Sequence, residues 1–406
     1  MHIGFYCRGW PVNEYPNGIV TYVHNLRREL LNQGHRVSVF ASEIGSLNRD
    51  PGIYLVRPLR TRRFSRQKLT QLFRKDRRVV FEWGKAIAAT VREVHERDPM
   101  DVFEMEESFG WCADVQMRVP VPVVVKLHGP EFLTRIALYG QSEIAPARID
   151  MEGRGLRQVG AIVSPSMSTL QRTVSYYDLH PDVQTVIPNP VVADPDIELW
   201  NLDTCERKTL LFVGQFSKVK GGDTMLIAFK RLVETDRDMK LIFVGPDRGI
   251  ATGERRTVSF HQFKDSLFAD AQRENIAYLG QLPRAEVSHL RTKAMLNIVV
   301  SRWENQPNTA LEAMAQGCPV VAFDTGGINE IIHHEITGLL ARDNDIDHLC
   351  EQITRLVKDP AGAKRMGEAA RRFVTDRHSV QKVANAAVEL YCQAISMANA
   401  GGKQSI

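Results

Sequence analysis

The stretch that decides the fold runs Ser301-Arg302-Trp303-Glu304-Asn305-Gln306-Pro307-Asn308-Thr309-Ala310-Leu311-Glu312-Ala313-Met314-Ala315-Gln316-Gly317. Proline is favoured at the first helical position because its missing N–H would be unsatisfied there, and glycine commonly follows the last turn. We therefore predict a helix from about Pro307 to Gln316. Glu304 then lies in the loop before the helix, and Glu312, eight positions later, lies on its second turn.

The start of this helix has the features of an anion site. The unpaired amides of Asn308, Thr309 and Ala310 are expected to point out of the positive end of the helix, where a phosphate is favoured. The flanking carboxylates of Glu304 and Glu312 can accept hydrogen bonds from hydroxyl groups. This combination suits a nucleoside diphosphate sugar. For the two acids alone, an ordinary amphipathic helix with a surface glutamate at each end is the alternative.

Composition limits the choice of protein class. A chain of 406 residues is too long for one core, so we expect two domains. The net charge of +4 is too small to indicate a nucleic-acid partner, and none is expected. The six cysteines are scattered without metal-ligand spacing. No leader and no apolar run long enough for a membrane span is visible, so a cytoplasmic location is the expectation.

Two series of short apolar runs alternate with helical stretches, as covered parallel sheets require. A helix expected to begin after Asn17 and to stop at Gly34 follows the first run. The runs of the first series are 3–7, 36–41, 102–105, 121–127 and 161–164, and those of the second are 210–213, 241–244, 276–279, 296–300 and 320–323.

The break between the two series is an acidic segment containing Pro195, so we expect an α/β fold with two doubly wound, Rossmann-like domains. Their bounds are predicted as 1–192 and 205–378, with a helix at about 380–398 packing back on the first domain. Two such sheets that face each other with the carboxyl ends of their strands would form a ligand cleft.

A glycine-containing turn opens the second domain, from Gly214 to Gly222 between a strand and a helix. Glycine lets a diphosphate approach the backbone closely, and Lys220 offers a mobile ammonium. Neither a Walker A loop nor a dinucleotide-binding fingerprint is present. A solvated surface turn is the alternative interpretation.

Further candidates follow other predicted strands. His128 ends a strand of the first domain, where its imidazole could donate to a sugar hydroxyl or simply cap the strand. Gly18 opens the first helix, whose amides could meet an anion or form a plain cap. Glu330, after the Gly326-Gly327 turn, is a weaker candidate because it could merely favour the helix dipole.

Together these motifs resemble glycosyltransferase family 4, the retaining group 1 enzymes of GT-B fold, and the resemblance covers nearly the whole chain. The motifs that carry it are the Glu304-to-Glu312 segment continuing into Cys318-Pro319-Val320-Val321-Ala322, Gly326-Gly327 with Glu330, Lys220-Gly221, Pro188-Asn189-Pro190, His128, Asn17-Gly18 and Gly34-His35. The resemblance implies that Glu312 binds the ribose, Glu304 and His128 the donor sugar, and Lys220 the diphosphate.

The chain departs from the family pattern at three places. Gln215 stands where the family usually has Arg, so Lys220, helped by Lys218, must neutralise more of the diphosphate. Gln306-Pro307 replaces a common Phe-Gly, and Asn17-Gly18 replaces a common Gly-Gly. The identity of the donor is therefore open, and a UDP- or GDP-sugar is the expectation. Asp-x-Asp triplets begin at Asp194, Asp236 and Asp343, but none follows a buried strand, so neither a metal nor another cofactor is expected.

The expected function is that of a retaining hexosyltransferase acting on a saccharide or lipid-linked acceptor in glycan or polysaccharide biosynthesis. Two carboxylates near an anomeric carbon could also carry out a glycosidase-like double displacement. We favour attack by the acceptor on the same face of the sugar, because Glu312 is expected to be occupied with the ribose. A GT-B sugar-nucleotide epimerase or phosphorylase, or an inactive sugar-nucleotide-binding protein, is the alternative.

A basic segment lies between Arg57 and Arg78, with ten Lys or Arg residues and one acid, Asp76. Apolar residues are interleaved at the spacing of an amphipathic helix. Such a helix could bind an anionic inner membrane surface or an acidic acceptor. A solvated basic face packed on the first domain explains the pattern as well.

Overall fold

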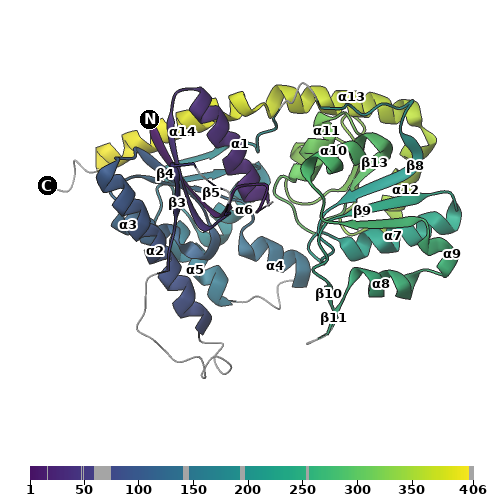
Figure 1. The fold of residues 1–406 in the computed structure, drawn as a ribbon, viewed down its shortest axis with the longest axis horizontal. Coiled ribbons are helices and arrows are strands. Elements are labelled where there is room, and N and C mark those ends of the chain that lie inside the picture. Colours follow the sequence, from purple (N-terminus) through teal and green to yellow (C-terminus); the bar gives the residue numbers. More distant parts are fainter. Residues whose placement is uncertain are drawn as a thin grey trace. The chain divides into compact units, whose positions relative to one another are not determined.

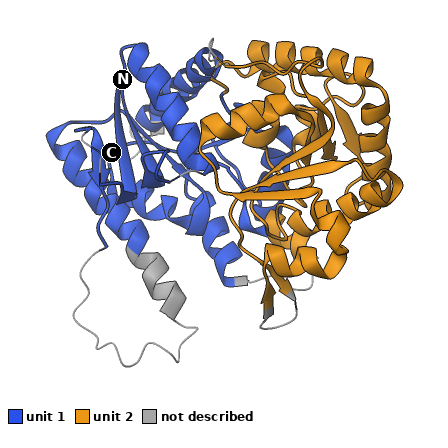
Figure 2. Ribbon diagram, turned by 45° about the vertical axis from the view of Figure 1, so that its right-hand side comes forward, with its two compact units in different colours: residues 1–132, 144–190, 380–406 blue, residues 133–143, 191–379 orange. Residues whose placement is uncertain are grey.

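The computed structural model describes residues 1–15, 17–46, 48, 50–58, 75–139, 146–192, 197–252 and 256–401. The chain forms two units, one of residues 1–132, 144–190 and 380–406 and the other of residues 133–143 and 191–379 (Figure 2). The described part of the connection between the two predicted domains, residues 197–204, belongs to the second unit. There Trp200 is buried and its indole N–H donates to the carbonyl of Ala294 at 2.8 Å.

The first unit is built on a seven-stranded parallel sheet of order β3-β2-β1-β4-β5-β6-β7. Its strands are β1 (His2–Trp10), β2 (Arg36–Ile44), β3 (Ile53–Leu55), β4 (Val102–Glu106), β5 (Val123–Lys126), β6 (Ala161–Ser164) and β7 (Val183–Val186). Its helices are α1 (Gly18–Asn32), α2 (Lys75–Arg97), η2 (Ser108–Gly110), α3 (Cys112–Arg118), α5 (Pro146–Leu156), α6 (Met167–Tyr177) and α14 (Val380–Gly401), and α4 (Glu131–Tyr139) runs across the unit boundary.

Helix α1 begins and ends where its sequence predicts. The Asn17 side chain accepts a hydrogen bond from the amide of Val20, which satisfies one of the free N–H groups of the first turn. Gly34 follows the helix with φ of +81°, a conformation that favours glycine. The predicted start and stop of this helix are therefore confirmed.

Helix α14 belongs to the first unit although it closes the chain. It lies beside α1 (Figure 1), and its inward side chains Val383, Ala387, Leu390 and Tyr391 are buried in the same core as strand β1. The apolar stripe of this helix thus covers the sheet on which the chain began.

The second unit holds a six-stranded parallel sheet of order β12-β9-β8-β13-β14-β15. Its strands are β8 (Glu206–Val213), β9 (Lys240–Val244), β12 (Ile276–Gly280), β13 (Ala294–Val299), β14 (Val320–Phe323) and β15 (Leu339–Ala341), with the separate hairpin β10 (Ile250–Thr252) and β11 (Arg256–Val258). Its helices are α7 (Gly222–Thr235), α8 (Phe260–Leu267), α9 (Asp270–Arg273), α10 (Arg284–Lys293), α11 (Asn308–Ala315), η3 (Ile328–Glu330), α12 (Ile346–Lys358) and α13 (Pro360–Arg377).

Both sheets have the strand order 3-2-1-4-5-6 when their strands are numbered within the unit, with a seventh strand added in the first. The chain reverses direction across the sheet between the first and fourth strands, and this switch point is where such sheets bind ligands. In the second unit the switch point lies between β8 and β13, which are paired.

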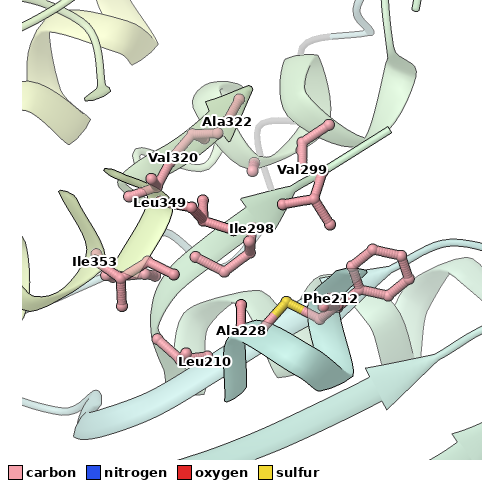
Figure 3. Close-up of a cluster of buried hydrophobic side chains, with 14 of the residues drawn as sticks. Leu210, Phe212, Ala228, Ile298, Val299, Val320, Ala322, Leu349 and Ile353 are labelled. Carbon is pink, nitrogen blue, oxygen red and sulfur yellow. The ribbon is translucent and has the colours of Figure 1, made fainter. Parts of the chain in front are cut away.

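Apolar side chains from strands and helices fill the core of the second unit. Figure 3 shows Leu210 and Phe212 of β8, Ile298 of β13 and Leu349 and Ile353 of α12 gathered into one cluster. This packing holds β8 and β13 side by side and so fixes the loops that leave their carboxyl ends.

Several predictions need correction. Helix α11 begins at Asn308, and Pro307 is its N-cap because its ψ of 119° is extended. The strand predicted at 121–127 is shorter in the structure, where β5 covers only Val123–Lys126, because Pro120 and Pro122 precede it. Strands β3, β7 and β15 and the hairpin were not predicted. Most of the basic segment 57–78 and the triplet at Asp194 lie outside the described residues.

Candidate active site

Two loops meet at the switch point of the second sheet. The first follows β8 and carries Lys220, and the second follows β13 and carries Glu304. Lys220 Nζ lies 2.5 Å from Glu304 Oε1, and the hydroxyl of Ser301 donates to the same oxygen at 2.7 Å. The two residues that the sequence assigned to a single ligand are therefore in contact.

The turn from Gly214 to Gly222 is locked against the β13 loop. A side chain at Gly221, where φ is +70°, would put its Cβ 1.9 Å from the carbonyl oxygen of Val300. Arg302 donates to both carboxylate oxygens of Asp223 at 2.8 and 2.9 Å, and its amide donates to the carbonyl of Val219. This pairing of a largely buried Arg with a buried Asp braces the turn.

The remaining candidates of this turn lie around Lys220. Gln215 is exposed, and Lys218 is half-buried while its carbonyl accepts from Arg302 Nη1. Gly214 lies against Gly245, where a Cβ would come within 2.0 Å of the Gly214 carbonyl oxygen. The backbone of the turn is thus close-packed, while the Gln215 side chain is exposed and those of Lys218 and Lys220 are partly exposed.

The N-terminus of α11 follows Glu304 by four positions. The amide of Ala310 donates to the carbonyl of Pro307 at 3.1 Å, so this group is occupied and the prediction of three free amides was wrong for Ala310. Within the described part of the chain, the amides of Asn308 and Thr309 donate to no backbone carbonyl. These two N–H groups keep the capacity to bind an anion.

Glu312 contacts two cations that the sequence analysis did not identify. Arg284 Nη2 lies 2.8 Å from Glu312 Oε1, and Arg291 Nη2 lies 2.6 Å from Oε2. Arg291 is buried, whereas Arg284 is mostly exposed. The two arginines, seven positions apart on α10, fix the direction of this carboxylate but leave lone pairs that can accept from a hydroxyl.

A glycine turn after β14 supports the backbone of Glu304. Gly327 donates its amide to the Glu304 carbonyl at 3.0 Å. At Gly326, where φ is +59°, a Cβ would come within 1.8 Å of the same oxygen. Glu330 ends the short helix η3 and is half-buried. Glycine is therefore required at position 326 by the close approach of backbone to backbone.

In the first unit, His128 follows the last residue of β5 by two positions and is half-buried. Its ring packs edge-on against Tyr22 with ring centres 5.5 Å apart, and its amide donates to Glu107. Desolvation, with the nearby Lys126 ammonium, lowers the pKa of His128 to about 3, so the imidazole is neutral at pH 7. Gly18 is exposed at the start of α1.

Among the residues that the structure describes, no three side chains of His, Cys, Asp or Glu lie close enough together to hold a metal ion. None of the described helices is long and apolar enough to cross a bilayer.

Two family models match the chain, one to each half. Residues 16–194 match Glycosyltransferase Family 4, and residues 201–373 match Glycosyl transferases group 1. The chain belongs to the family 4, group 1 glycosyltransferases. Lys220, Glu304 and Glu312 of the glycosyltransferase lie in the second match, and Gly18 and His128 lie in the first.

Relatives similar in sequence agree with this family. N-acetyl-alpha-D-glucosaminyl L-malate synthase of Bacillus anthracis is 26% identical over 318 residues, which are 75% of this chain and 78% of that protein. A protein of Methanocaldococcus jannaschii named as an uncharacterized glycosyltransferase is 23% identical, over 95% of this chain and 97% of that protein.

Solved structures share the fold. Sucrose-phosphate synthase of Thermosynechococcus elongatus has a TM-score of 0.77 at 18% identity, covering 98% of this chain and 99% of its own. Anabaena HepE, solved in complex with UDP-glucose, has a TM-score of 0.70 at 16% identity, covering 97% and 100%. The glycosyltransferase thus has two Rossmann-like units of the GT-B fold, as predicted.

Proposed function

We propose that this glycosyltransferase moves a hexose from a nucleoside diphosphate sugar to a saccharide or lipid-linked acceptor in glycan or glycoconjugate biosynthesis. The observation that carries the proposal is the contact of Lys220 with Glu304 at the switch point of the second sheet. An ammonium beside a carboxylate, next to a helix N-terminus, provides for both halves of such a donor, a charged diphosphate and a neutral sugar.

Each donor group has a proposed partner. Lys220, with help from Lys218, and the amides of Asn308 and Thr309 bind the diphosphate. Glu304 accepts from hydroxyls of the sugar. Glu312, oriented by its two arginines, accepts from the ribose. Gly214 and Gln215 line the same turn, and Glu330 is retained as a weaker candidate.

The proposed chemistry is charge stabilisation without a cofactor. The bond between the anomeric carbon and the diphosphate oxygen breaks, and negative charge accumulates on the leaving group beside Lys220 and the α11 amides, which stabilise it. The acceptor oxygen bonds to the same face of the anomeric carbon, and its proton passes to the leaving oxygen. Configuration is then retained, which NMR of the product's anomeric proton would test. A glycosyl adduct trapped on Glu304 would contradict this route.

The first unit is proposed to contribute His128. Because its low pKa keeps the ring neutral, the imidazole can donate one hydrogen bond to a sugar hydroxyl without adding a charge. Gly18, exposed at the start of α1, is proposed as a second donor-binding position through its helix amides.

UDP-sugars are the first donors to test, because HepE was solved with UDP and with UDP-glucose, and GDP-sugars come next. The experiment incubates the full chain with UDP-, GDP- and ADP-sugars, with and without saccharide acceptors, and measures release of nucleoside diphosphate. Release that depends on the acceptor supports transfer. Conversion of the donor without an acceptor would indicate an epimerase, and binding without turnover would indicate an inactive binding protein.

We further propose that the basic segment 57–78 directs the enzyme to an anionic membrane surface, on the basis of its ten cationic residues. Flotation of the full chain with vesicles that contain or lack anionic lipid tests this. Binding that does not depend on lipid charge would exclude it.

A further inference from the structure

Four polar side chains meet inside the core of the first unit: Tyr22 of α1, Glu104 of β4, Lys126 of β5 and Tyr391 of α14. All four are buried, and Lys126 is only 1% exposed. Charged groups are expensive to bury unless they are paired and hydrogen-bonded, so this cluster must be internally satisfied.

The contacts of the cluster satisfy that requirement. Tyr391 donates its hydroxyl to Glu104 Oε2 at 2.7 Å, and the Tyr22 hydroxyl interacts with both Glu104 and Tyr391. Lys126 Nζ donates to the carbonyl of Ile187 at 2.7 Å and lies 4.6 Å above the centre of the Tyr22 ring. Burial lowers the pKa of Lys126 to about 8, and the neighbouring Glu104 opposes that shift.

Tyr22 connects this cluster to His128. Its ring meets the imidazole edge-on, with an angle of 69° between the ring planes, and its face lies under the Lys126 ammonium. Its hydroxyl interacts with Glu104 and Tyr391. A tyrosine fixed at its face and at its tip cannot rotate freely, so the imidazole in contact with it is also restricted.

We propose that Tyr22 is a positioning residue for His128, and that Tyr391 acts through Glu104 to hold Tyr22 in place. Helix α14 thereby sets the orientation of the His128 imidazole, which lies more than 250 positions earlier in the chain. This proposal rests on the proposed role of His128 in transfer. The competing explanation is that the cluster stabilises the core without influencing His128.

The test compares two single hydroxyl deletions in the full chain. Tyr391→Phe removes the hydroxyl that holds Glu104. Tyr6→Phe is the matched control, because Tyr6 is also buried in the first unit and its hydroxyl shares a hydrogen bond with Ser42 at 2.8 Å. Tyr22→Phe serves as a second test variant that keeps the ring but removes the hydroxyl that interacts with Glu104 and Tyr391.

The first readout is the His128 ring resonance in NMR, assigned with His128→Gln, which needs no substrate. We expect it to shift or broaden in Tyr391→Phe and Tyr22→Phe and to stay unchanged in Tyr6→Phe. An unchanged resonance in both test variants would overturn the proposal. This outcome is independent of transfer, so it is separable from a failure of the proposed function.

The second readout is steady-state transfer. We expect kcat to fall about tenfold in Tyr391→Phe, less than the ~100-fold that a 1 Å misplacement can cause, with the donor KM unchanged. In a His128→Gln background the same change should have no further effect, because Tyr391 acts only through His128. Additive losses would show a purely structural role.

Discussion

Replacing Lys220 by Met tests the donor site most directly, because it removes the ammonium and keeps the length of the side chain. A hydrogen bond to a charged group contributes about 1.5–3 kcal/mol. Since 37% of the Lys220 side chain is exposed, solvent screening places the expected loss at the low end, about 1.5 kcal/mol. This loss corresponds to roughly a tenfold rise in the Kd for UDP, measured by titration calorimetry.

The chain offers a closely matched control. Lys230 on α7 is 39% exposed, and its ammonium lies 4.0 Å from Glu234. Lys230→Met removes an equally exposed lysine beside an acid but away from the switch point, so its Kd for UDP should equal that of the wild type. Higher salt should weaken UDP binding more in the wild type than in Lys220→Met.

A double variant separates the two tasks of Lys220. If Lys220 binds the diphosphate, adding Lys220→Met to Glu304→Gln should still weaken UDP binding. If Lys220 only neutralises Glu304, the double variant should bind UDP as well as Glu304→Gln alone. That recovery, or a Kd of Lys220→Met within about twofold of the wild type, would refute the assignment.

Three further predictions concern stability. Gly326→Ala should destabilise the second unit far more than Gly280→Ala, which should lower the free energy of unfolding by about 1–2 kcal/mol. Both glycines have positive φ, but only at Gly326 would the added Cβ meet a backbone oxygen, at 1.8 Å. Equal losses in chemical denaturation would contradict the steric argument. Arg302→Met should lower the free energy of unfolding by about 3–5 kcal/mol, because it breaks a largely buried ion pair with Asp223. Arg231→Met, which breaks an exposed pair, should lower it by at most about 1 kcal/mol. Comparable thermal shifts in the two variants would refute a bracing role for Arg302. Burial raises the pKa of Glu152 to about 8, so the folded state keeps a proton that the unfolded state loses. The free energy of unfolding should therefore fall as pH rises from about 5 to 8, and less steeply in Glu152→Gln. Identical slopes in the two proteins would exclude Glu152 as the source of the pH dependence.

Much of the fold could be predicted from the sequence, because strands covered on both faces appear as continuous apolar runs. Strand β6 has the predicted bounds and is fully buried. Strands β3 and β7 were missed because they are short edge strands with half-exposed residues, which leave no clear pattern. The start of α11 was misplaced by one residue because a proline fixes φ but not ψ.

The candidate site was predictable only where residues close in sequence act together. Lys220 and Glu304 were singled out by the turn and helix around them, but their direct contact depends on the pairing of β8 with β13. Arg284 and Arg291 were missed because nothing local links α10 to Glu312. Likewise, helical periodicity predicted that Tyr391 faces inward. Its hydroxyl's partner, Glu104, could not be predicted because it lies 287 positions away in the sequence.

The return of α14 to the first unit has a consequence for how the chain is made. The sheet of this unit is synthesised by Pro190, yet the helix that covers it begins at Val380. At about 5–20 residues per second, the ribosome needs roughly 10–40 s to cross that interval. Throughout it, the apolar surface later covered by Val383, Ala387 and Leu390 stays open, so the nascent first unit is expected to need chaperone protection and, expressed without its last helix, to aggregate.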